Sequence, residues 1–462
     1  MNVGTTSGRL PFLTKLLYGA GDVGVALSST AMAMYLLFFY TDVAGLGIGL
    51  AGLVSGIGRF WDAIVDPPVG YLSDKTRSRL GRRRVWFVLA AVPLGLSVYA
   101  VFAPPAGLGQ SGLFTWMLVT YLLAYLFLTM FLTPYYALGA ELSDNPEERT
   151  RIVAFRLMFQ YLGAVAGGFM PLLALRWGDP REGYGRVAAL FGAVAAAAIL
   201  LAFFGTRERA AAPASKASFR NFWTGVRGSL TNRPFRILLL TFVVMSIGGG
   251  VNMAVGIYAL IYWLGFSQSE VGLLFPTILA SAALALPAWT LLSGRIGKDR
   301  ALKVLCIYMV VVLSAVYFLT PYKPFVWTVM ILQGVGMGGF VVAGSLLADV
   351  LDHDELATGE QRGGAFFGFW TFANKFGAGI GPPLVGLALW FAGYAPNRPQ
   401  SAHTIEIMRL IYGPVSALLF LVAAIIIHRF PLTREVHREI QAEVHRRRAA
   451  RSSDAVAAVL VD

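Results

Sequence analysis

The stretch Leu50–Leu72, LAGLVSGIGRFWDAIVDPPVGYL, is apolar over most of its length but contains two acidic residues, Asp62 and Asp66. A spacing of four residues places both carboxylates on one face of a helix. An acidic side chain inside a membrane-spanning helix is costly without a partner, and such residues usually line the path of an ion or a substrate. The pair, with Arg59 before it and Pro67 after it, therefore points to a cation-coupled membrane carrier.

The composition is that of an integral membrane protein. Of the 462 residues, 56% are hydrophobic and only 14% are charged, whereas a soluble domain is about half apolar and about a quarter charged. Apolar stretches of about 20 residues, enough to cross the hydrocarbon core as helices, recur along the chain. We therefore expect an all-α membrane protein.

The apolar stretches number twelve, and the polar stretch 207–233 divides them into two groups of six. The expected spans are 12–41, 47–73, 85–106, 112–142, 152–178, 186–206, 234–264, 269–293, 301–320, 325–351, 363–393 and 404–430. The expected organisation is a six-helix bundle over 1–206, a cytoplasmic loop over 207–233, a second bundle over 234–430 and a basic tail over 431–462.

Basic loops recur at equivalent places in the two halves. GYLSDKTRSRLGRRR follows the second span and LLSGRIGKDRALK follows the eighth. Such a parallel repeat is typical of major facilitator transporters, which bind substrate between the halves. The first of these loops also resembles the superfamily's loop between its second and third helices.

The formal net charge of +13 is distributed over alternate connections. Lysines and arginines crowd the loops near 75–84, 207–236 and 295–303, while the loops near 42–48, 103–112 and 264–269 have none. This pattern places both termini in the cytoplasm. It excludes a nucleic-acid partner as the reason for the charge, and we expect the tail residues Arg446–Arg448 to lie against anionic lipid headgroups.

Several motifs together resemble one branch of that superfamily. They are KLLYGAGDVG (15–24), FFYTDVAGL (38–46), RFWDAIVDPPVGYL (59–72), ADVLDHDELATGEQRGGAFFGFWTFANKFGAGIG (348–381) and FAGY (391–394). The chain is identified by them as a member of the glycoside–pentoside–hexuronide:cation symporter family, which includes the bacterial sodium–melibiose carrier. It is also similar to the vertebrate sodium-dependent lysophospholipid transporter. The resemblance implies a major facilitator fold and secondary active symport.

The resemblance assigns the coupling cation to Asp62 and Asp66, with an oxygen from Thr129 on the fourth helix. Carboxylate and hydroxyl oxygens suit Na⁺, and a pair of neighbouring carboxylates can instead share a proton. Sugar carriers often have Asn before the second acid, but this chain has Val65, so Na⁺ and H⁺ both stay open. A purely structural ion pair with a buried base is the alternative.

Two basic residues within apolar runs, Arg156 and Lys375, match family positions and are candidates for substrate binding or coupling. A buried cation requires a counter-charge, and the resemblance gives Asp62 and Asp66 as the nearest acids. Arg156 has an alternative, in which its side chain extends to the cytoplasmic interface. Asp22 is either a charge at a helix end or a contact in the cleft.

The substrate site departs from the pattern of sugar carriers. Ala26 and Leu132 stand where those carriers place acids that bind hydroxyl groups, while an aromatic residue is retained as Tyr136. Losing both acids removes much of the recognition of hydroxyl groups. A disaccharide is therefore a less secure substrate here than the family suggests.

Charged residues at the cytoplasmic helix ends are expected to form a conformational latch. The residues are Asp74, Arg82 and Arg83 after the second span, and Asp349 and Asp352 at the end of the tenth. Acids facing basic loop residues can hold one conformer through charge-assisted hydrogen bonds. A metal site in the second group is the less favoured alternative.

The leading hypothesis is a cation (Na⁺ or H⁺):solute symporter for a glycoside or related small organic solute, and a carrier of a lysophospholipid or other amphiphile is the nearest alternative. A non-transporting receptor or membrane enzyme is a third hypothesis, but the chain has no H-E-x-x-H, G-x-S-x-G or Walker A motif. We expect no cofactor beyond the coupling ion and a monomer in the plasma membrane, typically the bacterial inner membrane.

Overall fold

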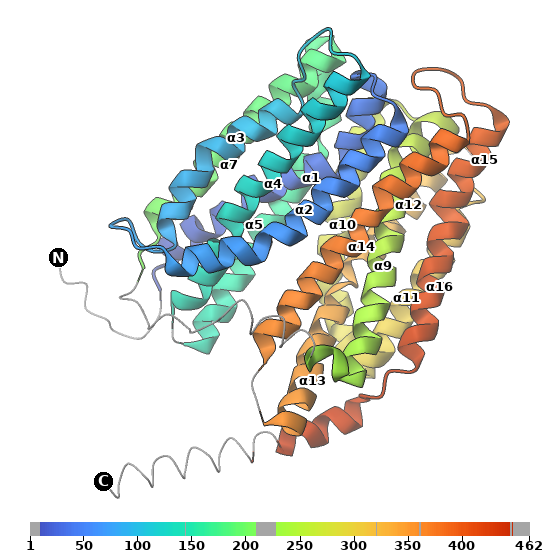
Figure 1. The fold of residues 1–462 in the computed structure, drawn as a ribbon. Helices are drawn as coiled ribbons and strands as arrows, with labels where there is room; N and C mark the ends of the chain where they lie inside the picture. The colour runs from blue at the N-terminus through green and yellow to red at the C-terminus, as the bar shows by residue number, and fades with distance from the viewer. Residues whose placement is uncertain are drawn as a thin grey trace, which may run out of the picture.

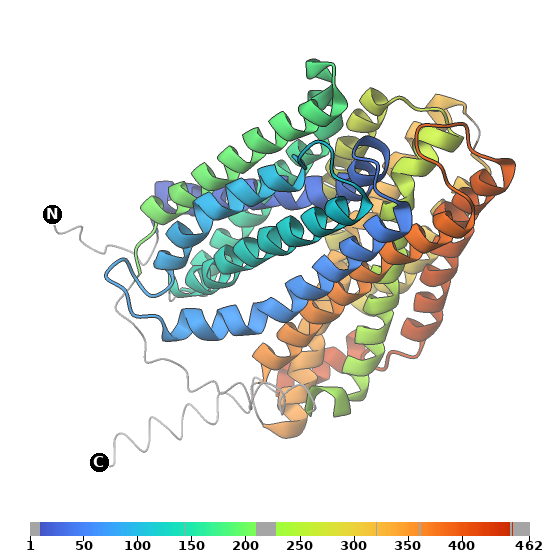
Figure 2. The ribbon, with the colours of Figure 1, turned by 45° about the horizontal axis from the view of Figure 1, so that its top comes forward.

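The computed structural model describes residues 10–143, 145–208, 228–319, 321–359, 362–443 and 446, and every regular element within them is helical. The helices gather in two elongated groups that follow each other along the chain (Figure 1). The start of α1 and the end of α16 lie toward the same end of the molecule (Figure 1), and the two groups stay distinct when the molecule is turned (Figure 2).

The first group consists of α1 (Phe12–Phe38) with η1 (Phe39–Val43), α2 (Ile48–Lys75), α3 (Arg84–Val101), α4 (Gln110–Glu141), α5 (Pro146–Gly168), α6 (Met170–Ala174) with η2 (Leu175–Trp177), and α7 (Pro180–Gly205). The second group consists of α9 (Arg233–Tyr258) with η3 (Ala259–Trp263), α10 (Gln268–Ile296), α11 (Lys298–Val316), α12 (Lys323–Gly338), α13 (Val341–Thr358), α14 (Gly363–Phe391), α15 (Ala402–Leu410) with η4 (Ile411–Val415), and α16 (Ser416–His428).

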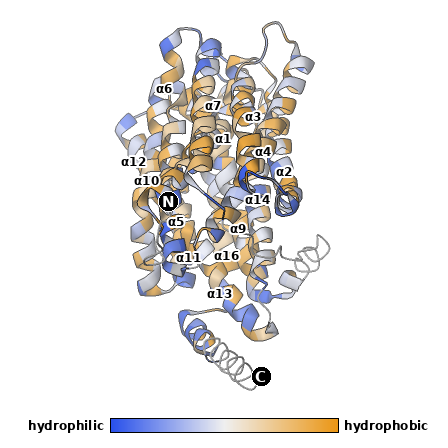
Figure 3. Cartoon of the chain, turned by 90° about the vertical axis from the view of Figure 1, so that its left-hand side faces the viewer, coloured by the Kyte–Doolittle hydropathy of each residue, from blue (hydrophilic) through white to orange (hydrophobic). Residues whose placement is uncertain are grey.

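The surface of the helices is suited to lipid. Apolar residues cover the middle of the molecule and hydrophilic residues gather toward its two ends (Figure 3). Among the described residues, nine helical segments are long and apolar enough to cross a membrane, and a bent pair formed by α5 and the α6–η2 segment is a tenth candidate. The described residues thus form an all-helical structure suited to a membrane, while twelve crossings stay a prediction.

The fifth expected span is broken rather than straight. Its two parts, Glu147–Gly168 and Met170–Trp177, meet at 48°. Pro171 lies just after the break, and a proline lacks the N–H that would continue the helix. The hydroxyl of Tyr35 on α1 donates a hydrogen bond of 2.5 Å to the carbonyl oxygen of Gly168 at the break.

One glycine on α1 and one on α12 bring helices close together. A Cβ atom at Gly24 would collide with the backbone of Ala195 on α7, and one at Gly334 would collide with the backbone of Ile278 on α10. These glycines therefore serve helix packing, as small residues do in membranes. Cys306 is a free cysteine and is fully buried.

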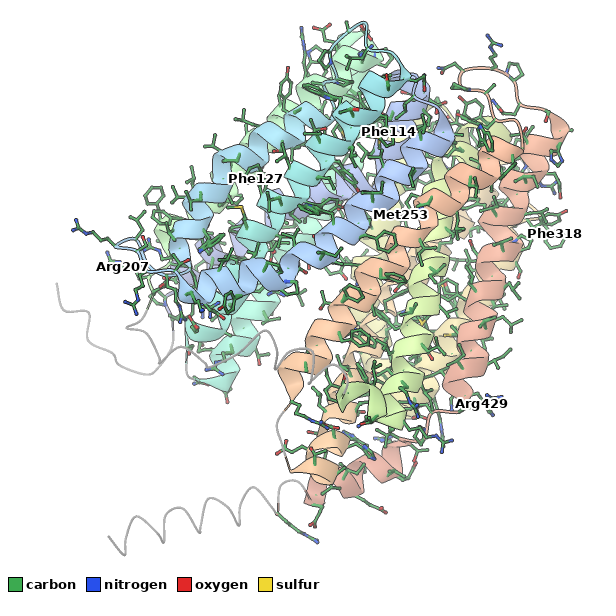
Figure 4. The ribbon with its side chains drawn as sticks, viewed as in Figure 1. Phe114, Phe127, Arg207, Met253, Phe318 and Arg429 are labelled. Carbon is green, nitrogen blue, oxygen red and sulfur yellow. The ribbon has the colours of Figure 1, made fainter. Side chains whose placement is uncertain are left out.

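The two groups touch mainly along α2 and α14 and between α5–α6 and α10. Gly52 and Gly386 make the first contact possible, since a side chain on either would meet backbone atoms of the other helix. Toward the end with the chain termini the groups diverge (Figure 1). Arg207 and Arg429 lie toward that end, and Phe114 lies toward the opposite one (Figure 4).

Three predicted features fall wholly or partly outside the described residues. Most of the 207–233 loop, including residues 209–227, is one of them. The others are the tail beyond Arg446, with Arg447 and Arg448, and the N-terminal residues 1–9.

Candidate functional site

The acid pair of α2 meets the lysine of α14 where the two groups pack together. Nζ of Lys375 lies 2.9 Å from Oδ1 of Asp62 and 2.7 Å from Oδ2 of Asp66. The Asp62 side chain is only 4% exposed, whereas the Asp66 side chain is 30% exposed. One ammonium group thus bridges two carboxylates that sit one helical turn apart, and solvent reaches the pair from the side of Asp66.

A hydroxyl group from α4 completes this cluster. Oγ1 of Thr129 lies 3.2 Å from Oδ1 of Asp62 and 3.2 Å from Oδ1 of Asp66. Thr129 itself is 1% exposed. Two carboxylates and a hydroxyl converge on one point, which is a set of hard oxygen ligands of the kind that alkali and alkaline-earth cations prefer. These three residues were predicted from the sequence, and the structure brings all of them together.

Arg59 balances the charge of the cluster from the preceding helical turn. Its guanidinium carbon lies 5.6 Å from the centre of the Tyr125 ring, and the Tyr125 and Tyr121 hydroxyls are 3.2 Å apart. The formal charges of Arg59 and Lys375 cancel those of the two aspartates. Burial of unpaired charge in this region is thereby avoided.

Arg156 pairs with Asp22, and the expectation that its counter-charge is Asp62 or Asp66 is wrong. Nε of Arg156 lies 3.1 Å from Oδ2 of Asp22, which is 1% exposed. The reason is the helix packing, since α5 lies along α1 rather than beside α2. The guanidinium group also stacks 4.1 Å from the centre of the Tyr136 ring. Asp22 is therefore an interior contact rather than a helix-end charge.

A pocket of about 330 Å³ lies within the first group of helices beside this ion pair. It is lined by Ala26, Leu132 and Tyr136, together with Val25, Ser29, Thr30, Leu128, Gln160, Tyr161 and Ala164. Its size is in the range of small-molecule sites. The two positions where sugar carriers have acids thus face one pocket, and its lining combines aliphatic side chains with hydroxyl groups and one amide.

The charged residues predicted as a latch after α2 form a cluster with an acid that the sequence analysis missed. Arg83 lies 3.2 Å from Asp74 and 2.7 Å from Glu141 at the end of α4, and Arg82 lies 3.0 Å from the same Glu141. Glu208, also missed, accepts hydrogen bonds of 2.6 to 2.8 Å from the backbone N–H groups of residues 82–84. Neither acid belongs to a quoted motif, and only their positions at helix ends hint at these roles.

The corresponding cluster in the second group joins α13 to the start of α11. Nζ of Lys298 lies 2.5 Å from Asp349, and the imidazole of His437 lies 3.4 Å from Asp349 and 3.3 Å from Asp352. Each of the two clusters stays within its own group of helices. In the described part of the chain no set of three or more His, Cys, Asp or Glu residues is arranged to hold a metal ion.

Glu208→Gln is expected to lower the free energy of unfolding by about 1–3 kcal/mol, because a charged acceptor for three backbone donors is lost at the start of α3. The thermal unfolding midpoint of purified protein measures this. Glu182→Gln is the matched control, since Glu182 is an exposed acid in the first turn of α7 and should change stability by less than about 0.5 kcal/mol. Equal midpoints for the two variants would contradict the assigned role of Glu208.

Comparison with known proteins identifies the fold and family. The model of the family described as "MFS/sugar transport protein" matches residues 17–434. The chain belongs to this family. It is therefore a multi-pass membrane transporter and not an enzyme, and the family resemblance drawn from its motifs is confirmed.

Individual relatives cover nearly the whole chain. The inner membrane symporter YicJ of Escherichia coli is 29% identical over 438 residues, which are 90% of this chain and 91% of that protein. The sodium-dependent lysophosphatidylcholine symporter 1 of Gallus gallus is 27% identical over 473 residues, 93% of this chain and 88% of that protein.

Solved structures of transporters share the fold. A D-xylose–proton symporter superimposes with a TM-score of 0.67 at 15% identity, covering 91% of this chain and 98% of that chain. A bacterial homologue of the lysosomal transporter Spinster, in an inward-facing and unoccupied conformation, gives a TM-score of 0.68 at 14% identity over 92% of this chain and 100% of that chain.

Proposed function

We propose that this protein is a cation:solute symporter in which Asp62, Asp66 and Thr129 bind the coupling ion, Na⁺ or H⁺. The observation that carries the proposal is the ammonium group of Lys375 between the two carboxylates, 2.9 Å and 2.7 Å away. That position is the one a small cation needs in order to contact both acids. The lysine therefore acts as an internal competitor, which holds the acids when the ion is absent.

Coupling follows from this competition. Lys375 belongs to α14 and the acids belong to α2, so the salt bridge links the two groups of helices. A cation that binds the acids releases the lysine, and that release changes the contact along which the groups pivot. Binding of an ion thereby alters the equilibrium between inward-facing and outward-facing conformers, as a ligand with different affinities for two states must.

For the topology we propose twelve membrane crossings in two six-helix units, 1–206 and 234–430, with the 207–233 loop, the 431–462 tail and both termini in the cytoplasm. Each of the twelve apolar stretches overlaps a helix, with breaks near Gly168 and Gly339. The alternation of basic loops supports the orientation. We propose a monomer in a bacterial inner membrane, and the latch clusters at Arg83 and Asp349 then face the cytoplasm.

The substrate site is proposed to be the pocket that Ala26, Leu132 and Tyr136 line, with the Asp22–Arg156 pair beside it. Hydroxyl and amide groups suit a glycoside or a related small organic solute. The aliphatic part of the lining favours the second candidate, a lysophospholipid or other amphiphile, and sodium-dependent lysophosphatidylcholine symporters are among the relatives.

A ligand screen on purified protein separates the two candidates. Because the pocket lacks acids at positions 26 and 132, we expect melibiose to bind weakly or not at all, and a less hydroxylated or amphiphilic solute to bind better. Binding titrations with melibiose and with lysophosphatidylcholine, each with Na⁺ and with choline as the only added cation, measure this. Tight Na⁺-dependent binding of melibiose would overturn the inference about the pocket, and cation-independent uptake of every accepted solute into proteoliposomes would overturn symport.

A further inference from the structure

The motif FFYTDVAGL contains a carboxylate, Asp42, whose hydrogen-bond partners come largely from the other group of helices. α1 loosens there into the π-helical turn η1, which contains Thr41 and Asp42. Asp42 is 8% exposed and Thr41 is 1% exposed. The cation and substrate sites described above use neither residue.

Three hydroxyl groups donate to the Asp42 carboxylate. They belong to Thr41, 2.5 Å from Oδ2, to Tyr394, 2.7 Å from Oδ1, and to Tyr262, which also bonds Oδ1. The ion pairs among the described residues include none to Asp42. Its charge is therefore stabilised by these hydroxyl dipoles rather than by an ion pair with a described residue, and hydrogen bonds to a charged acceptor are stronger than those between neutral groups.

The same short segment makes further bonds to the second group. The Thr41 hydroxyl lies 2.9 Å from the Tyr258 hydroxyl on α9. The side-chain amide of Asn397 donates to the Asp42 carbonyl oxygen at 2.7 Å, and the backbone N–H of Asn397 donates to the Tyr262 hydroxyl at 2.8 Å. Elements η1, α9, η3 and the α14–α15 connection are thus joined into one network centred on Asp42.

The network lies at the end of the molecule where the groups meet. Figure 1 shows η1 and the α14–α15 connection at the end opposite the chain termini. At the other end, the ion pairs of Arg83 and of Asp349 stay within one group each. Hydrogen bonds therefore join the two groups at the end that contains Asp42. At the opposite end, the charged clusters of Arg83 and Asp349 do not connect one group to the other.

We propose that Asp42 is a positioning residue for transport that holds the outer side of the carrier closed in the inward-facing conformer. The proposal rests on the function and orientation proposed above. Opening the outer side must separate η1 from Tyr258, Tyr262 and Tyr394, because these residues belong to the other group. The carboxylate then exchanges protein hydroxyls for water, so the network sets the free-energy difference between the two conformers.

The distance between the outer ends of the two groups tests this directly and requires no substrate. In a Cys306→Ser background, Ala106→Cys in the α3–α4 connection and His403→Cys on α15 place spin labels on exposed positions of the two groups. Double electron–electron resonance on protein in nanodiscs then gives the distance distribution without Na⁺. Asp42→Asn removes the charge at nearly constant volume.

The expected result is a longer-distance population that rises by about tenfold relative to the parent, since loss of a charged hydrogen bond shifts a two-state equilibrium by about that factor. Asp179→Asn is the matched control. Asp179 is an exposed acid that caps α7 at the same end of the molecule, and its replacement should leave the distribution unchanged.

If Asp42→Asn does not yield folded protein, the double variant Tyr262→Phe/Tyr394→Phe removes the two donors of the second group and should shift the distribution in the same direction. Unchanged distributions in the folded variants would overturn the proposal. Because the measurement involves neither uptake nor a coupling ion, an absence of symport would not produce that outcome.

Discussion

Asp62→Asn should abolish accumulation of solute against its gradient. Asp62 is the more deeply buried acid of the pair, with a side chain 4% exposed, and it contacts both Lys375 and Thr129. Truncating one partner of a buried, hydrogen-bonded charge pair costs about 2–5 kcal/mol. At 1.4 kcal/mol for each factor of ten, cation affinity should fall by about 30-fold or more.

The measurement is uptake into proteoliposomes with an imposed Na⁺ or proton gradient, using whichever solute the ligand screen yields. Asp66→Asn should show the same defect in milder form. The Asp66 side chain is 30% exposed, so water can replace some of the contacts that its carboxylate makes to the cation. Glu182→Gln, at an exposed acid in the first turn of α7 outside the ion site and the latch clusters, is the control. Normal cation dependence of uptake in Asp62→Asn would remove this residue from the ion site.

The acid pair and its lysine could be found from the sequence because they interrupt apolar stretches. In such surroundings each charge requires a partner, and few candidates exist. The partner of Arg156 could not be found in the same way. Hydropathy shows that a charge is buried but gives no information on which helix lies opposite, and the packing of α5 along α1 selects Asp22.

Helix ends show a second limit of hydropathy. The fifth and sixth spans were expected to begin at 152 and 186, but the helices begin at Pro146 and Pro180. Their first turns are polar and extend beyond the apolar stretch. Asn145 and Asp179 cap these helices through side-chain acceptors and are each followed by proline. This combination of cap and proline is a sequence signal for a helix start that hydropathy alone does not include.

The pocket and the Asp42 network depend on contacts between distant segments. The motif containing Asp42 was visible as a family feature, but its partners lie more than 200 positions away along the chain. Glu141 and Glu208 likewise act through the folded arrangement of helix ends. Sequence patterns therefore predicted the elements and the intramembrane charges, whereas the pairing of charges across elements required the structure.

Lys375→Met separates binding of the coupling ion from its use. Nζ of Lys375 occupies the point between the two carboxylates, so its removal leaves Asp62 and Asp66 with no competitor and with mutual repulsion. A cation should then bind at least as tightly as in the parent. Uphill accumulation should be lost, because the carrier can no longer form the ion-free conformer in which Lys375 pairs with the two acids. Asp62→Asn, by contrast, should lose both cation binding and uphill accumulation.

Thermal unfolding of purified protein reports the binding, because a ligand that binds only the folded state raises the midpoint by an amount that grows with its affinity and concentration. Midpoints in NaCl and in choline chloride of equal ionic strength should differ at least as much for Lys375→Met as for the parent, and should coincide for Asp62→Asn. If protons are the coupling ion, the same contrast should appear between buffers of different pH in choline chloride.

Arg186→Met, which removes an exposed cation paired with Glu182 on α7, should leave both binding and accumulation intact. Retention of uphill accumulation by Lys375→Met, or loss of its cation-dependent stabilisation, would contradict the competition between lysine and ion.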